Sequence, residues 1–167
     1  MFIRYAASSL AVFALSLAAI PQASTPALEA DKVFVGKVSQ GGMYEVEASK
    51  LAQQKATAPD VVDLAVMEVH DHTLVNNGLK KVAAQENIPV SDTLNSTFQQ
   101  RLQTLQGKSG AEFEAAYLTD MEQIHAMDEK LFAQEATNGS PNFQPFARQT
   151  DLIVKRHIGA LHALDAN

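Results

Sequence analysis

The sequence predicts an all-α protein, a four-helix bundle with a short extra helix in the long connection between its second and third helices. Three observations lead to this fold class. Apolar residues recur at steps of three and four through most of the chain beyond residue 31, which is the period of an amphipathic helix. No segment there shows the sustained alternation of a half-buried strand. Pro and Gly residues divide the chain into four long segments and one short segment.

Length and composition limit the classes of protein to which the chain can belong. The 167 residues are 46% hydrophobic, which is enough for one domain with its own core. The net charge is −6 and no run of Lys or Arg occurs, so we expect no nucleic-acid partner. The sequence has no Cys, which excludes disulfides, thiolate metal sites, Cys nucleophiles and covalent c-type haem attachment.

Residues 1–25 have the pattern of a secretory signal peptide. Arg4 is followed by a long uncharged run rich in Ala, Leu, Val and Phe, and then by small residues and a Pro. We expect cleavage between residues 23 and 30 and a bundle domain over 31–165, in a periplasmic or secreted protein that could associate with the envelope. The alternative is an uncleaved anchor, although about 20 apolar residues are needed to span a bilayer. Membrane contact, if any, is then expected only through this N-terminus.

The first two helices are predicted from caps and turn residues. The first begins at Asp31, a favourable N-cap residue, and ends near Ala56. Residues 57–60 read Thr-Ala-Pro-Asp, a cap with Pro in the first turn, so the second helix begins there and ends near Glu86.

The remaining helices follow from the same signals. Asn87-Ile88-Pro89 ends the second helix, and residues 93–106 form a short amphipathic helix. A capping-box pattern, Ser109 with Glu112, opens the third long helix, which ends near Thr137. The fourth long helix spans about 142–164. Its predicted apolar stripe comprises Phe143, Phe146, Thr150, Ile153, His157, Ala160 and Leu164.

The connection over residues 87–108 leaves two arrangements open. Its length is sufficient to cross the whole bundle, at ~1.5 Å per helical and ~3.3 Å per extended residue, and such a crossover gives a ferritin-like four-helix bundle. Alternatively, the short helix caps one end of the bundle.

Each long helix carries one metal-capable side chain near its midpoint, on its predicted apolar stripe. These residues are Glu45, His72, His125 and His157. Because all four lie at similar depth, three imidazoles and a carboxylate could face one another and hold a single Zn, Fe, Mn or Cu ion.

Further carboxylates lie within one helical turn of these histidines. Glu68 precedes His72 by four residues, and Glu122 and Asp128 flank His125 at three residues, so each could orient or ligate. Glu122 and His125 have the Glu-x-x-His spacing of di-iron bundles. The fourth helix has Val154 at the equivalent position, so we do not expect a di-iron centre.

The same cluster could instead be a buried polar network that fixes helix register without any ligand. In that interpretation Glu45 accepts hydrogen bonds from two imidazoles, and Tyr117 or Thr150 completes the network.

An ordered set of residues resembles a bacterial exported family called domain of unknown function 4142. The set comprises Asp31, Phe34, Gly42, Glu45, Leu51, Ala52, Ala65, Met67, Asp71, His72, Leu79, Phe113, Tyr117, His125 and His157. The resemblance implies a ferritin-like fold with Glu45 and the three histidines at polar core positions. The family is often labelled a membrane or outer-membrane protein, without an established activity.

Two hypotheses about function follow. The first is an exported metal-binding bundle. The second is a non-catalytic envelope or stress-related protein that binds a partner of unknown identity. Motifs of hydrolases and phosphate-binding loops do not occur, so we lean against an enzyme. The oligomeric state stays open.

Overall fold

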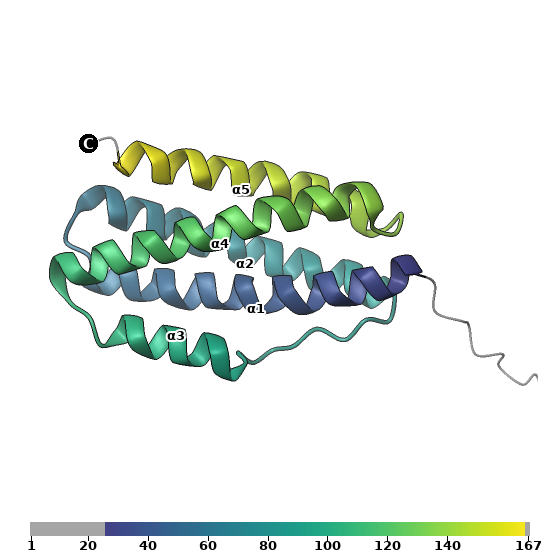
Figure 1. Ribbon diagram of the computed structural model, residues 1–167, viewed down its shortest axis with the longest axis horizontal. Helices are drawn as coiled ribbons and strands as arrows, with labels where there is room; N and C mark the ends of the chain where they lie inside the picture. The colour runs from purple at the N-terminus through teal and green to yellow at the C-terminus, as the bar shows by residue number, and fades with distance from the viewer. Residues whose placement is uncertain (1–25, 166–167) are drawn as a thin grey trace, which may run out of the picture.

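The computed structural model describes residues 26–165, and every regular element among them is an α-helix. The predicted signal peptide lies outside the described residues. Four long helices and one short helix follow one another along the chain (Figure 1). They are α1 (Pro26–Lys55), α2 (Pro59–Gln85), α3 (Ser96–Gln106), α4 (Gly110–Asn138) and α5 (Phe143–Asp165). The predicted all-α class and the order of elements are confirmed.

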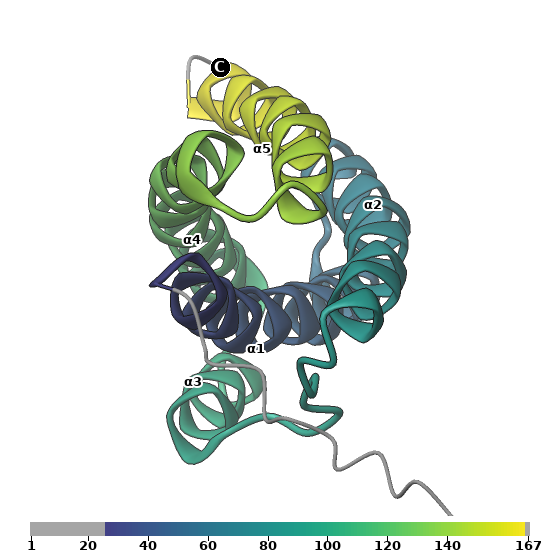
Figure 2. The same cartoon turned by 90° about the vertical axis from the view of Figure 1, so that its right-hand side faces the viewer.

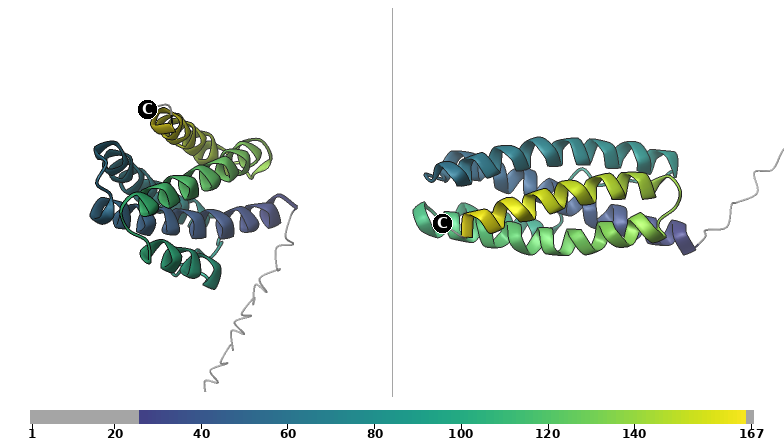
Figure 3. Two further views of the ribbon diagram at one scale, coloured as in Figure 1. Left: turned by 60° about the vertical axis from the view of Figure 1, so that its left-hand side comes forward. Right: turned by 90° about the horizontal axis from the view of Figure 1, so that it is seen from above.

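The four long helices form a ring when the molecule is viewed along its long axis (Figure 2). α1 lies beside α2 and α4, and α5 lies opposite α1 and completes the ring between α2 and α4. The axes of all four helices are nearly aligned, as the view from above shows (Figure 3, right). This is the arrangement of a four-helix bundle, in which each helix buries one stripe toward the centre.

The connection after α2 crosses the length of the bundle on its outside. An extended segment leads from the end of α2 to α3, which runs alongside α1 and α4, and α4 then begins at the opposite end from where α2 stopped (Figure 1). The crossover is therefore the correct one of the two predicted arrangements, and the ferritin-like topology is confirmed.

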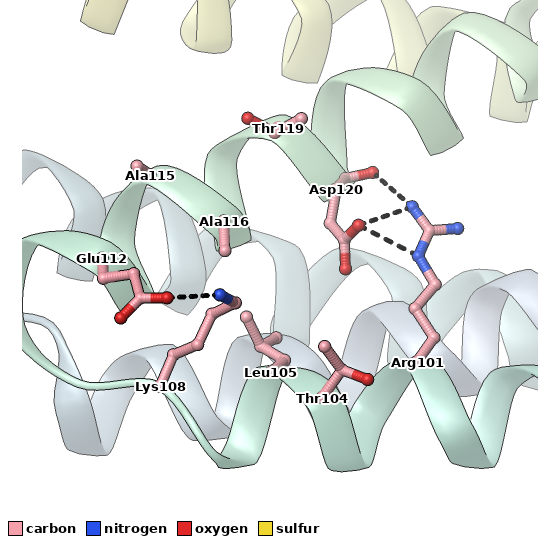
Figure 4. Close-up of a pocket in the computed structure, with 9 residues that line it drawn as sticks. All are labelled: Arg101, Thr104, Leu105, Lys108, Glu112, Ala115, Ala116, Thr119 and Asp120. Carbon is pink, nitrogen blue, oxygen red and sulfur yellow. Dashed lines mark hydrogen bonds and ion pairs between the residues drawn. The ribbon is translucent and has the colours of Figure 1, made fainter.

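Apolar packing and an ion pair both attach α3 to the bundle. Leu105 is 2% exposed. Arg101 donates from Nε and Nη2 to Asp120 Oδ1 on α4, over 3.0 and 2.8 Å (Figure 4). Asp120 also accepts a hydrogen bond from the hydroxyl of Tyr44 on α1, which links α1, α3 and α4.

One predicted helix start and one predicted side-chain cap are wrong. α1 begins at Pro26 rather than at Asp31, because Asp31 is buried and accepts a hydrogen bond from the backbone N–H of Ser140 instead of capping a helix. Ser109 makes no side-chain cap, so the predicted capping box does not form. Its partner Glu112 pairs with Lys108.

The buried stripe of α5 also differs from the prediction. Phe143, Thr150 and His157 are buried as expected, whereas Ile153 and Ala160 are only half-buried. The buried residues between them are Ala147, Val154 and Leu161. The buried stripe of α5 is therefore rotated toward Val154 and Leu161 relative to the predicted stripe.

The core consists of two apolar clusters separated by a polar layer. One cluster includes Tyr44, Phe113 and Met121, and the other includes Phe34 and Phe132. The chain segments between these clusters on α2, α4 and α5 carry buried ionisable residues. They are Glu68, Asp71, His72, His125 and His157. The fold thus encloses a polar layer between two apolar core clusters.

Candidate metal centre

Four buried side chains from three helices converge in the middle of the bundle. Ligand atoms of Glu68, His72, His125 and His157 all lie within 4.8 Å of one another. α2 provides Glu68 and His72 on one face, because residues four apart on a helix are neighbours. α4 and α5 each provide one histidine. The structure therefore brings together the three histidines that the sequence singled out.

The carboxylate at the centre is Glu68, which the sequence analysis placed in a secondary role. Its Oε2 lies 3.1 Å from His72 Nε2 and 3.2 Å from His157 Nδ1, and its Oε1 lies 3.4 Å from His125 Nε2. Glu68 thus contacts all three imidazoles.

Glu45 lies at the edge of this group. Its Oε2 is 3.1 Å from His72 Nδ1, and its Oε1 is 3.7 Å from His125 Nε2. It is fully buried but does not belong to the tight set of four. The sequence analysis placed Glu45 at the centre and Glu68 beside it. In the structure Glu68 lies at the centre and Glu45 lies beside it.

The outer nitrogens of two imidazoles have fixed hydrogen-bond partners. His125 Nδ1 lies 2.7 Å from the carbonyl oxygen of Met121, and His157 Nε2 lies 2.8 Å from Asp71 Oδ2. Both oxygens can only accept, so both outer nitrogens carry hydrogen. In neutral imidazoles the inner nitrogens then present lone pairs.

Those inner nitrogens face each other. His125 Nε2 and His157 Nδ1 are 3.0 Å apart. Two lone pairs at this distance repel, so a proton or a metal cation is needed between or beside them. The arrangement also has the form of metal-bound histidines in general, whose second nitrogen donates to a carbonyl or a carboxylate.

Asp71 is a partner of the cluster that the sequence analysis missed. It accepts from His157, from His70 Nδ1 over 3.0 Å, and from Arg156. Burial alone would raise the pKa of Asp71, but these three hydrogen bonds lower it below its usual value, so it is a carboxylate. Its position three residues after Glu68 was the available signal.

Several buried atoms of the cluster have no hydrogen bond. They are both carboxylate oxygens of Glu45, both of Glu68, and His72 Nε2. Their contacts are short in distance but do not align a hydrogen with an acceptor. Buried polar atoms are rarely left in this condition, and a bound cation is one explanation for such a group.

When no metal is bound, burial and neighbouring charges determine which groups of the cluster are protonated. Burial acts to lower the pKa of His125, but Glu68 and Glu45 overcome this effect and raise it to about 10. Burial also opposes ionisation of Glu68, yet its close contacts with the three histidines lower its pKa well below the usual value. For Glu45, burial and the nearby Asp128 and Glu68 raise the pKa. Burial lowers the pKa of His72. The central pair is therefore an imidazolium beside a carboxylate.

Two further predicted carboxylates lie outside the group of four. Glu122 is half-buried and lines a surface pocket between α4 and α5, away from the cluster. Asp128 is half-buried, and its pKa is raised to about 6 because burial outweighs the attraction of His125. Only Asp128 is in electrostatic contact with the cluster.

The residues proposed to complete a purely structural network are bonded elsewhere. The hydroxyl of Tyr117 lies 2.9 Å from Ser49 Oγ, and Thr150 donates to the carbonyl of Phe146. That part of the sequence interpretation is wrong, since neither hydroxyl reaches the unsatisfied oxygens.

Comparisons with known proteins identify the family. Residues 17–164 match the family described as domain of unknown function, DUF4142. The chain belongs to this family. A search of curated proteins finds no match.

A solved structure shares the fold of this DUF4142 chain. It is that of a presumed secreted protein, DUF305, from Streptomyces coelicolor, with a TM-score of 0.67 at 17% identity over 81% of this chain and 91% of the other. At that identity the likeness concerns the fold alone. Neither match supports the membrane or outer-membrane label, and no helix among the described residues has the length and apolar character needed to cross a membrane.

The donor set of the DUF4142 cluster is three imidazole nitrogens and a carboxylate. Such donors suit Zn, Fe, Cu or Mn rather than Ca or Mg, which prefer oxygen ligands. Val154 is buried where a second Glu-x-x-His motif would need a carboxylate. The described residues therefore offer one ion's ligands and not the set of a di-iron centre.

Proposed function

We propose that this protein is an exported four-helix bundle that binds a single transition-metal ion through Glu68, His72, His125 and His157. The observation that carries the proposal is the pair of inner nitrogens of His125 and His157, 3.0 Å apart, with their outer nitrogens held by acceptors. A metal ion coordinated by both nitrogens would remove the repulsion of their lone pairs.

The unsatisfied carboxylate oxygens give independent support. Glu68 contacts all three imidazoles within 3.4 Å but forms no aligned hydrogen bond with any of them. A cation in this space would satisfy Glu68 and His72 Nε2 together. Asp71 would then act on the ion through His157, by fixing the tautomer and the ring orientation of that ligand.

A second candidate function is structural, and one observation favours it. In the metal-free protein His125 is a positively charged imidazolium, and the carboxylate of Glu68 balances its charge. A buried pair of this kind can fix helix register without a ligand. In this case the outer surface of the bundle binds a partner and the cluster holds no ion.

Elemental analysis of the mature protein, purified without a His-tag, distinguishes the two candidates. We expect close to one metal ion per chain in the wild type and none in a folded His125→Ala/His157→Ala variant. The matched control is His162→Ala, which removes an exposed imidazole and should leave the metal content unchanged. Metal-free wild-type protein that gains no ion from Zn, Mn, Fe or Cu solutions would favour the structural role.

Export is the second part of the proposal. Its support is the signal-like sequence over residues 1–25 and the fold shared with a presumed secreted protein. N-terminal sequencing of the native protein should find a start between residues 24 and 31. An N-terminus at Met1 in protein recovered from membranes would indicate an uncleaved anchor instead.

A further inference from the structure

A pocket between α1 and α4, beside the start of α3, leads toward the polar centre of the bundle. Its volume is about 460 Å³, and its walls include Gly36, Gly41, Phe98, Ile124 and Asp128. Glycines on α1 leave the pocket open because they carry no side chain there. A Cβ on Gly36 would meet no atom within 4 Å, and one on Gly41 would be 4.0 Å from Glu45 Oε2. The inner wall of the pocket therefore lies against the carboxylate that flanks the cluster.

Asp128 is the charged group at this inner wall. It lies one turn beyond His125 on α4, and its charge acts on both Glu45 and His125. By contrast, the lining of the pocket between α4 and α5 includes neither Asp128 nor a residue of α1. Ile158 and Leu161 form part of its lining, and Leu161 belongs to the dry core.

We propose that the pocket lined by Gly36, Gly41 and Asp128 is the route by which a divalent transition-metal ion enters the centre, with the Asp128 carboxylate as its first protein ligand on the way. Glu45 follows Asp128 along this route and contacts His72 and His125 directly. Asp128 and then Glu45 provide a series of carboxyl groups from the pocket toward the cluster. This inference rests on the proposed metal site but concerns the rate of binding.

The rim of the pocket carries two positive charges. Lys37 and Lys130 line it and would repel an incoming cation. If the ion passes here, removing either charge should accelerate uptake, and removing the charge of Asp128 should slow it. Opposite effects of nearby charges on one rate constant are the signature of an electrostatic route.

Uptake of Co²⁺ by the metal-free protein measures that rate, because ligand-field absorption of the bound ion reports its arrival. Asp128→Asn should slow uptake by about tenfold at low ionic strength, and Lys37→Gln with Lys130→Gln should accelerate it by a similar factor. Equilibrium stoichiometry should stay at one ion in all these variants. Glu129→Gln in the pocket between α4 and α5 is the matched carboxylate control and should leave the rate unchanged.

A second pair of variants tests the space rather than the charge. Gly36→Leu places a side chain in the pocket and should slow uptake, whereas Gly159→Leu on α5, which is also unobstructed and lies outside the pocket, should not. Both changes replace an exposed helical Gly, so both should maintain the fold.

The outcomes separate the route from the site. Wild-type protein that takes up no Co²⁺ at equilibrium overturns the proposed function and this inference with it. Normal stoichiometry with equal rates in all variants overturns the route alone. So does a rate slowed by Glu129→Gln but not by Asp128→Asn, which would assign entry to the pocket between α4 and α5.

Discussion

Two histidine tautomers determine what the centre of the bundle can hold. The Met121 carbonyl fixes one and the Asp71 carboxylate fixes the other, so both imidazoles present their second nitrogen to the same space. A proton at that position makes the cluster a structural ion pair, and a metal ion there makes it a binding site. Asp71 matters in both cases, because its carboxylate fixes the tautomer and orientation of His157.

Asp71→Asn should therefore weaken metal binding while retaining all four ligands. Loss of a carboxylate behind a ligating histidine typically lowers metal affinity by roughly 10–100-fold. Competition with a chelator of known affinity measures this change. Asp63→Asn, an exposed carboxylate on the same helix, is the control and should bind as the wild type does. Equal affinities for the two variants would contradict the role given to Asp71.

Glu68 is expected to stabilise the metal-free protein as the counter-ion of His125. Glu68→Gln leaves a buried imidazolium without its partner, and breaking a buried pair from one side costs about 3–5 kcal/mol. Chemical denaturation of metal-free protein gives the free energy of unfolding. A loss below about 1 kcal/mol would show that His125 is neutral and that no ion pair exists there.

At the scale of elements, a carboxyl pair joins the start of α1 to the turn between α4 and α5. Asp31 and Glu135 are both buried, and Asp31 Oδ1 accepts from the backbone N–H of Ser140. Burial, together with the hydrogen bond and the charge of Asp31, raises the pKa of Glu135 to about 8. Glu135 is therefore protonated in the folded protein at pH 7.

This junction predicts that stability falls as the pH rises from about 4.5 to about 8. In the unfolded chain Glu135 ionises near its ordinary pKa of about 4.5, so between pH 4.5 and 8 the folded protein binds the extra proton. The contribution of Glu135 to stability falls as pH rises through this window and is lost above it. Glu135→Gln should flatten the decline of the thermal midpoint between pH 6 and 9. An unchanged slope in this variant would exclude Glu135 as its source.

The order and approximate bounds of the helices could be predicted from the sequence. Which face of each helix is buried could be predicted less well. Caps and turns such as the Thr-Ala-Pro-Asp segment located α2, because these residues act through local backbone chemistry. In contrast, the buried face of α2 includes Glu68 and Asp71. Because these residues are polar, the pattern of apolar residues does not show which face of the helix is buried. The sequence therefore identified the histidines but not the central carboxylate, whose place depends on packing against α4 and α5.

At the scale of the whole molecule, the polar centre links three of the four bundle helices. The dry clusters on either side hold the ends of the bundle together, and Glu68 with the histidines occupies the layer where α2, α4 and α5 meet. A ligand bound there by the folded state alone would stabilise the entire bundle, since none of these residues are close together in the unfolded chain.

Thermal unfolding should therefore depend on the concentration of free metal ion. At a free Zn²⁺ concentration of 100 times Kd, binding adds about 2.7 kcal/mol to the free energy of unfolding, which corresponds to a rise of roughly 8 °C in Tm for a domain of this size. The midpoint should increase further with each tenfold increase in free Zn²⁺. Ca²⁺ should have no such effect, because three imidazoles are poor ligands for it. The His125→Ala/His157→Ala variant should not respond to Zn²⁺, whereas His162→Ala should respond as the wild type does. If all three proteins shift equally, the ion binds at exposed residues and the centre of the bundle is a structural network.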